Sequence, residues 1–138
     1  MTKEQLFNLI KRHINTGADK NKIWTLIDIY NKRKEGLDSF HDLVLVACSE
    51  QFLVSVEDIK GDNRKRPIPD IRKIYSKILF DNGYTREKTG ETINRNHSTI
   101  TVNLTKFDNL YQTDFGFKNN YDEILIKIQE EINKNKLL

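Results

Sequence analysis

Apolar residues recur every three or four positions over the first part of the chain, the spacing that places them on one face of a helix. Thr2 and Gln5 form a capping box at the start of this pattern, and Gly17 offers a stop. Asp19 is expected to cap a second helix, which ends in a basic cluster before Gly36. The apolar stripes of these two predicted helices are Leu6, Phe7, Ile10, Ile14, Ile23, Trp24, Ile27 and Tyr30.

Helical spacing continues through the middle of the chain. Asp38 is expected to cap a third helix, and Ser55 opens a short helix that ends at Lys60. A polar loop follows, after which the clearest helical pattern begins near Pro69 and stops at Gly83. The inward residues expected of the two longer helices are Phe40, Leu43, Val44, Ala47, Ile71, Ile74, Tyr75, Ile78 and Leu79.

Two helices joined by a tight turn come next. Thr85 is expected to cap a brief helix that ends near Thr92, and a turn at Asn94–Asn96 leads into a helix from His97 to about Gln112. A short helix, a tight turn and a longer helix form the pattern of a helix-turn-helix motif.

The last part of the chain predicts a loop over Phe115–Asn119 and then an amphipathic helix. The apolar residues of that helix are Tyr121, Ile124, Leu125, Ile128 and Ile132. Its apolar face either packs on the protein's own core or forms a surface for a second copy or another protein. The prediction is therefore an all-α fold, a compact helical bundle that contains a helix-turn-helix.

The predicted helices divide into three parts. Residues 1–37 form an N-terminal helical extension, residues 38–112 the domain that contains the helix-turn-helix, and residues 113–138 the C-terminal helix. The whole chain has 138 residues, which is enough for one core without disulfide or metal support.

Charge is unevenly distributed. The net charge is only +3, but the segment from Lys60 to Lys106 holds eleven Lys or Arg residues against five Asp or Glu residues. Such a concentrated basic region favours a polyanionic partner, and it is also found on solvated faces with no ligand. Arg72, Lys73 and Lys77 are expected on the face of their helix opposite the stripe of Ile71, Ile74 and Ile78. The basic residues expected to contact a sugar-phosphate backbone are Arg64, Lys65, Arg66, Arg72, Lys73 and Lys77.

The helix that begins at His97 has one unusually uncharged face. Its inward stripe is expected to contain Ile100, Leu104, Phe107 and Tyr111, so Ser98, Val102, Thr105 and Asn109 face outward. Short hydroxyl and amide side chains suit a helix that enters the DNA major groove, because they can hydrogen-bond to base edges. An alternative is that Asn96 only caps this helix and that His97 is a solvated turn residue. The residues expected at DNA are Arg95, Asn96, His97, Ser98, Thr99, Thr101, Val102 and Thr105.

Three segments resemble the C-terminal DNA-binding domain of the bacterial replication initiator DnaA, a helix-turn-helix domain of the Trp-repressor-like kind. They are Cys48–Ile59, the basic run Arg64–Arg66 with Asp70–Lys73, and Gly90 followed by Ile93–Ile100. The last is the specific match, because it is similar to the Asn-Arg-Asp-His-Ser-Thr-Val signature of that family. The sequence departs from the family in having Asn96 in place of the usual aspartate.

The resemblance implies that His97, Ser98 and Thr99 contact bases in the major groove and that the Arg64–Arg66 loop reaches the adjacent minor groove. Arg72 would match the family's arginine at the start of the long helix. The resemblance covers about half of the chain, and no phosphate-cradling Gly-x-x-x-x-Gly-Lys-Ser/Thr motif occurs. We therefore expect sequence-specific binding of double-stranded DNA without the ATPase module, as in a replication accessory or a phage or mobile-element regulator.

Other functions are weighed against this one. An interaction adaptor would use the N-terminal or C-terminal helices to bind a protein partner, with no DNA target. An enzyme is the poorest interpretation, because the three histidines are dispersed at positions 13, 41 and 97 and no metal-ligand spacing appears. We expect no catalytic residue, no cofactor and no metal. The single cysteine, Cys48, and the absence of a long apolar run predict a cytoplasmic protein without a membrane segment.

Overall fold

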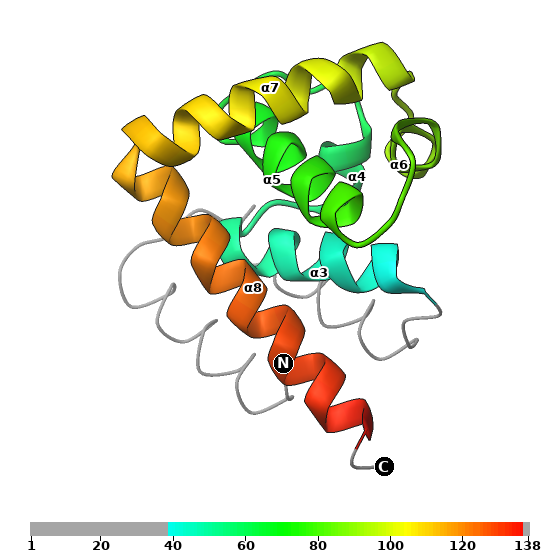
Figure 1. Ribbon diagram of the computed structural model, residues 1–138, viewed down its shortest axis with the longest axis vertical. Helices are drawn as coiled ribbons and strands as arrows, with labels where there is room; N and C mark the ends of the chain where they lie inside the picture. Colours follow the sequence, from blue (N-terminus) through cyan, green and yellow to red (C-terminus); the bar gives the residue numbers. More distant parts are fainter. Residues whose placement is uncertain (1–38, 137–138) are drawn as a thin grey trace.

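The computed structural model describes residues 39–136, with side chains up to residue 133, and shows six α-helices there (Figure 1). They are α3 (Phe40–Phe52), α4 (Val56–Lys60), α5 (Ile68–Asp81), α6 (Arg86–Thr92), α7 (His97–Thr113) and α8 (Phe115–Lys136). The described part contains no strand, which confirms the all-α prediction. The two helices predicted before residue 37 lie outside the described residues. No described helix combines the length and the apolar character needed to cross a membrane.

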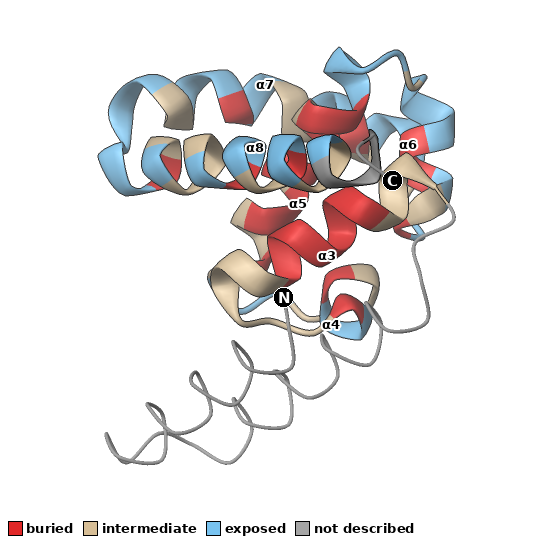
Figure 2. Ribbon diagram, turned by 90° about the horizontal axis from the view of Figure 1, so that it is seen from below, coloured by how far each residue is buried: buried red, intermediate tan, exposed pale blue. Residues whose placement is uncertain are grey.

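The core lies between α3 and α5, and α7 and α8 close it from outside. Figure 2 shows buried residues concentrated on α3 and α5, whereas α6 and α7 are mostly exposed. Tyr75, Ile74 and Leu79 of α5 are fully buried, as are Val44 and Cys48 of α3. Complete burial of an aliphatic side chain contributes about 1.5–3 kcal/mol. Helix α5 is therefore the centre of the core, and the more exposed helices α6 and α7 pack against it.

Helix starts follow the polar residues that precede each apolar stripe. The side chains of Ser55, Thr85 and Asn96 accept hydrogen bonds from the backbone N–H three residues later, which confirms the predicted caps Ser55 and Thr85 and makes Asn96 the cap of α7. The cap of α3 is Ser39 and not Asp38, because the Ser39 hydroxyl oxygen accepts from the Asp42 N–H. This predicted boundary is wrong by one residue.

The prediction of a loop over Phe115–Asn119 is wrong. Only Asp114 separates α7 from α8, and its carboxylate accepts a hydrogen bond of 3.0 Å from the Phe117 N–H, so it caps α8. Phe117 is thereby turned inward, where its ring lies edge-on to Phe107 at 5.3 Å between centroids. The first turn of α8 has Gly116 between Phe115 and Phe117, a spacing of two residues that does not continue the apolar stripe by which the helix was predicted.

The C-terminal helix packs on the protein's own core along one face. Ile124 and Ile128 are buried, and α8 contacts both α3 and α7. Phe107 stacks with Tyr111 and lies edge-on to Tyr121, so an aromatic cluster joins α7 to α8. The C-terminal part of the chain is thus continuous with the helix-turn-helix core (Figure 1).

The turn between α6 and α7 is very tight. Asn94 adopts a left-handed conformation with φ of 57°, and the Arg95 N–H donates to the Gly90 carbonyl at 2.8 Å. A Cβ atom at Gly90 would lie 2.2 Å from the Arg95 carbonyl oxygen. Only glycine lets α6 approach the turn this closely, and this approach sets the angle between α6 and α7.

Replacing Gly90 with alanine is therefore expected to destabilise the fold by at least about 1–3 kcal/mol, the usual cost of overpacking against a backbone that cannot move aside. Gly116→Ala is the matched control, because its new Cβ would make only an ordinary 3.5 Å contact with the Asp114 side chain. In a helix that change is neutral or stabilising by up to about 1 kcal/mol. Urea denaturation of both variants measures the difference, and equal stabilities would contradict the close-approach argument.

Candidate nucleic-acid interface

The outward face of α7 forms an exposed, uncharged ridge, which we call the reading ridge: Ser98, Val102 and Thr105. All three are exposed, and Val102 keeps 49% of its surface accessible. Ile100 and Phe107, on the other side of the helix, are buried against α5 and α8. The predicted division of α7 into an inward stripe and an outward ridge is confirmed.

The amino end of α7 is shaped by Asn96. Its side-chain oxygen accepts from the Thr99 N–H at 2.9 Å and from the Thr99 hydroxyl at 3.1 Å. Asn96 is thus a cap, as the alternative interpretation holds, and His97 and Ser98 project into solvent beside it. Thr99 is half-buried and faces a neighbouring cleft rather than the ridge. Capping by Asn96 does not exclude DNA contact, because its amide nitrogen is a separate donor.

Threonine hydroxyls along α7 donate back to their own helix. The Thr101 hydroxyl donates to the His97 carbonyl at 3.0 Å, and the Thr105 hydroxyl donates to the Thr101 carbonyl at 3.1 Å. With the donor used in this way, each hydroxyl oxygen keeps its acceptor capacity and each methyl group has a fixed direction. The exposed groups are therefore suited to accept hydrogen bonds and to make apolar contact.

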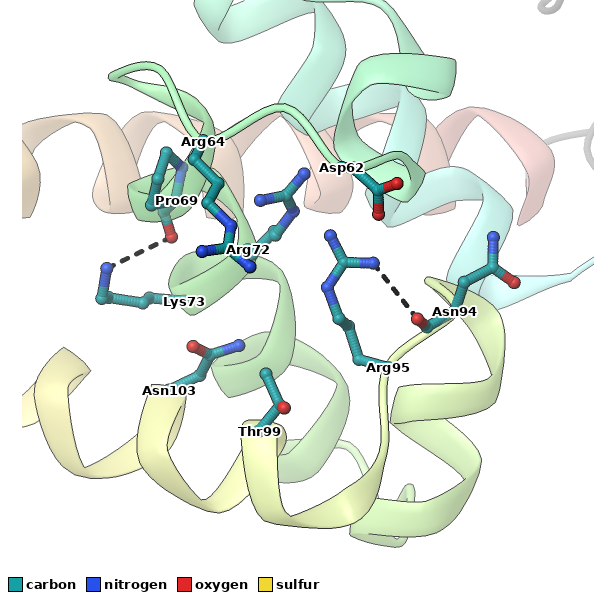
Figure 3. A pocket seen from close by; sticks show the side chains of 9 residues that line it. All are labelled: Asp62, Arg64, Pro69, Arg72, Lys73, Asn94, Arg95, Thr99 and Asn103. Carbon is teal, nitrogen blue, oxygen red and sulfur yellow. Dashed lines mark hydrogen bonds between the residues drawn. The ribbon is translucent and has the colours of Figure 1, made fainter.

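A cleft of about 500 Å³ opens between the amino end of α7, the start of α5 and the loop before α5 (Figure 3). We call it the basic cleft, because four cationic side chains and a single carboxylate line it. Its residues are Asp62, Arg64, Pro69, Arg72, Lys73, Asn94, Arg95, Thr99 and Asn103. Five of the predicted site residues, from three separate segments, are thus brought together.

Arg72 is not on an exposed face of α5, so that prediction is wrong. Arg72 is 7% exposed, and its guanidinium donates to three backbone carbonyls at the carboxyl end of α4. The distances are 2.8 Å to Ile59, 3.0 Å to Asp58 and 2.7 Å to Gly61. Burial, together with the nearby charge of Arg95, lowers the pKa of Arg72 from its ordinary value. The main role of this guanidinium is therefore structural: it donates to carbonyls at the end of α4 that have no partner within that helix.

Arg95 also binds the carboxyl end of α4, and it shares the Gly61 carbonyl with Arg72. Its guanidinium donates to the Gly61 carbonyl and, at 3.3 Å, to the Lys60 carbonyl. Asn94 adds a weaker bond of 3.5 Å to the Lys60 carbonyl. The turn before α7 is thereby tied to the loop that carries the basic residues.

The remaining predicted cations differ in their exposure and in whether they form an ion pair. Arg64, Lys65 and Arg66 are exposed on the loop before α5. Lys73 is half-buried and pairs with Asp70 at 3.5 Å, and Lys77 pairs with Asp81 at 3.3 Å. The loop therefore offers the more accessible positive charge.

Two residues of the candidate interface, Asn103 and Arg86, were not predicted from the sequence. Asn103 lines the basic cleft one turn after Thr99, and its amide donates to the buried Ser76 hydroxyl at 3.4 Å. Arg86 lies on the opposite side of α7, where its guanidinium is 5.2 Å from the centre of the Phe80 ring. The i, i+4 relation of Thr99 and Asn103 was a usable signal, whereas the position of Arg86 depends on how α6 packs. The described residues contain no group of three or more potential metal ligands.

Because Arg72 satisfies buried carbonyls, Arg72→Met is expected to destabilise the fold by about 2–4 kcal/mol, the cost of leaving such acceptors unpaired. Arg64→Met is the matched control, because Arg64 is exposed on the loop before α5 and such surface changes usually alter stability by no more than about 0.5 kcal/mol. Thermal and urea unfolding of the two variants provide the comparison. If both variants were as stable as the wild type, Arg72 would not have the structural role assigned to it.

Neither the known protein-family models nor the solved structures contain a match to this chain. The function is accordingly proposed from the geometry of α7 and its surroundings.

Proposed function

We propose that this protein binds double-stranded DNA in a sequence-specific manner, with α7 in the major groove. The observation that carries the proposal is the exposed, uncharged reading ridge of α7, which begins beside a loop of three exposed cations. A helix of about 10–12 Å diameter fits a major groove about 12 Å wide, and its backbone can approach the base edges closely where the groove-facing side chains are short. Ser98, Val102 and Thr105 meet that condition.

The chemistry of the ridge fits base edges. Hydroxyl oxygens accept hydrogen bonds from the amino groups of adenine or cytosine, and Val102 and the threonine methyl groups can contact the thymine methyl. His97 and Ser98 lie at the leading end of α7, where side chains of helix-turn-helix proteins reach bases. These positions also carry the similarity to the DnaA signature, in which the corresponding residues face the major groove.

The basic loop supplies binding that does not depend on sequence. Arg64, Lys65 and Arg66 are exposed, and contacts of Lys and Arg with phosphates release counterions. In the resembling family this loop reaches the adjacent minor groove, and we propose the same placement here. The biological role that fits such a protein is a replication accessory or a transcriptional regulator.

The proposal predicts that the two groups of residues have different effects on binding. In fluorescence anisotropy with a duplex selected from a randomised pool, Ser98→Ala or His97→Ala should cost about 1–3 kcal/mol on the selected site and little on random duplex. Lys65→Ala should weaken both duplexes by a similar factor and reduce the slope of log K against log salt by about 0.9. Equal losses on both duplexes from all three variants would refute the assignment of roles.

A protein-interaction adaptor is the second candidate function. It is favoured by the exposed apolar side chains of Phe115 (82% exposed) and Ile126 (51% exposed) at and beyond the α7–α8 corner. Charge reversal at Arg64 and Arg66 separates the two functions. If the doubly reversed protein bound random duplex as tightly as the wild type, the DNA proposal would fail and the adaptor would be preferred.

A further inference from the structure

Two hollows flank α7, one on each side of the reading ridge. The basic cleft contacts α7 through Thr99 and Asn103. A smaller groove of about 190 Å³ is lined on its α7 side by Thr101, Leu104, Thr105 and Asp108. At about 100° per residue, these two sets of α7 residues project in roughly opposite directions, with Ser98 and Val102 between them. The helix therefore has a hollow on either flank of its outward face.

The second hollow is also cationic, and it is built on an aromatic ring. We call it the aromatic groove, and its wall away from α7 consists of Lys77, Phe80 and Arg86. Phe80 is 39% exposed, and the Arg86 guanidinium lies over its ring at 5.2 Å. A cation–π contact holds a guanidinium in place without occupying its N–H donors. Arg86 is exposed, so those donors face the groove and the solvent.

Two carboxylates reduce the positive charge of the aromatic groove but do not neutralise it. The Lys77 ammonium is 3.3 Å from the Asp81 carboxylate and 5.7 Å from the centre of the Phe107 ring, so part of its charge is compensated. Asp108 is the one carboxylate that lines the groove itself. Arg86 is thus the cation best placed to meet an external anion there.

We infer that the aromatic groove is a second backbone-binding site, in which Arg86, assisted by Lys77, contacts phosphates of the DNA strand opposite to the one bound by the basic loop. The inference rests on the proposed function and extends it. A major groove is bounded by one phosphate backbone on each side, so a helix lying in it has a strand along each flank. The basic loop and cleft serve one flank, and the aromatic groove serves the other.

Asp108 sets the strength of the second contact. A carboxylate about 6–8 Å from a backbone phosphate in water disfavours binding by a factor of roughly two to three at low salt. Asp108→Asn is therefore expected to tighten binding to every duplex by that factor. The expected direction is opposite to that of the cation variants, and a loss of fold would not produce it.

The test uses the full chain and a duplex selected from a randomised pool, in which single phosphates on either strand are replaced by neutral methylphosphonates. In the wild type, positions that lower affinity are expected on both strands. Arg86→Gln should abolish the penalty at positions on one strand, and Arg64→Gln should abolish it at positions on the other. Arg86→Gln should also reduce the salt slope by about 0.9, whereas the charge-preserving Arg86→Lys should restore most of that slope.

Lys118→Gln is the control for loss of one positive charge, because Lys118 pairs with Asp122 on α8 and lies near Tyr111 rather than the ridge. If the wild type binds no duplex at all, the proposed function fails and this inference fails with it. If the wild type binds but Arg86→Gln behaves like Lys118→Gln, only the inference is overturned. Loss of penalties on the same strand in Arg86→Gln and Arg64→Gln would overturn it as well. Unfolding temperatures show whether each variant is folded.

Discussion

Two guanidinium groups donate hydrogen bonds to the carboxyl end of α4, and the geometry of the candidate interface depends on these bonds. Arg72 comes from the first turn of α5 and Arg95 from the turn before α7, and both donate to the Gly61 carbonyl. A short helix such as α4 leaves its last carbonyls without partners, and buried carbonyls without partners are costly. The two arginines satisfy them and at the same time join three segments that are far apart in the sequence.

The position of the basic loop follows from this junction. Gly61 is the last fixed point before Arg64, Lys65 and Arg66, and α5 begins directly after them. The loop is therefore held at both ends, by the arginine contacts and by the buried start of α5 at Ile68. Because Arg95 also belongs to the turn that starts α7, the loop and the amino end of α7 share one anchor. Their separation is fixed by hydrogen bonds to charged groups, which are stronger than those between neutral groups.

Local signals in the sequence were sufficient for much of the fold. Ser55, Thr85 and Asn96 each precede an apolar stripe and each caps the predicted helix, since capping depends only on residues within one turn. The inward stripe of α7 could be predicted for the same reason. The start of α8 was missed although Asp114 caps it locally, because Phe117 in its first turn packs against Phe107, ten residues earlier and on another helix. Helix periodicity contains no information about such a contact.

The candidate site was predictable only in part, and Arg72 shows why. Helix periodicity placed it opposite the apolar stripe, where a cation is normally solvated. The actual surroundings of Arg72 are set by α4, whose carbonyls it reaches over eleven to fourteen residues of sequence. Likewise, Arg86 belongs to the interface only because α6 is pressed against the turn at Gly90 and thereby lies along one flank of α7. The identity of a cation is visible in the sequence, but whether it satisfies carbonyls or faces a ligand is decided by tertiary contacts.

Arg72 and Arg95 bind backbone carbonyls, whereas Arg64, Arg66 and Arg86 are more accessible, and this difference bears on affinity and specificity in the proposed complex. A guanidinium committed to backbone carbonyls is preorganised, and it fixes its neighbours without adding flexible charge to the surface. The accessible arginines, Arg64, Arg66 and Arg86, lie on the flanks of α7, whereas Ser98, Val102 and Thr105 of the reading ridge are uncharged. A ridge of short side chains contributes little long-range attraction, so the proposed discrimination between sequences acts only after the flanks have drawn the helix into the groove. In the proposed complex, cations beside the ridge rather than on it would let phosphate contacts provide affinity, while the short side chains of the ridge would remain free to contact the bases.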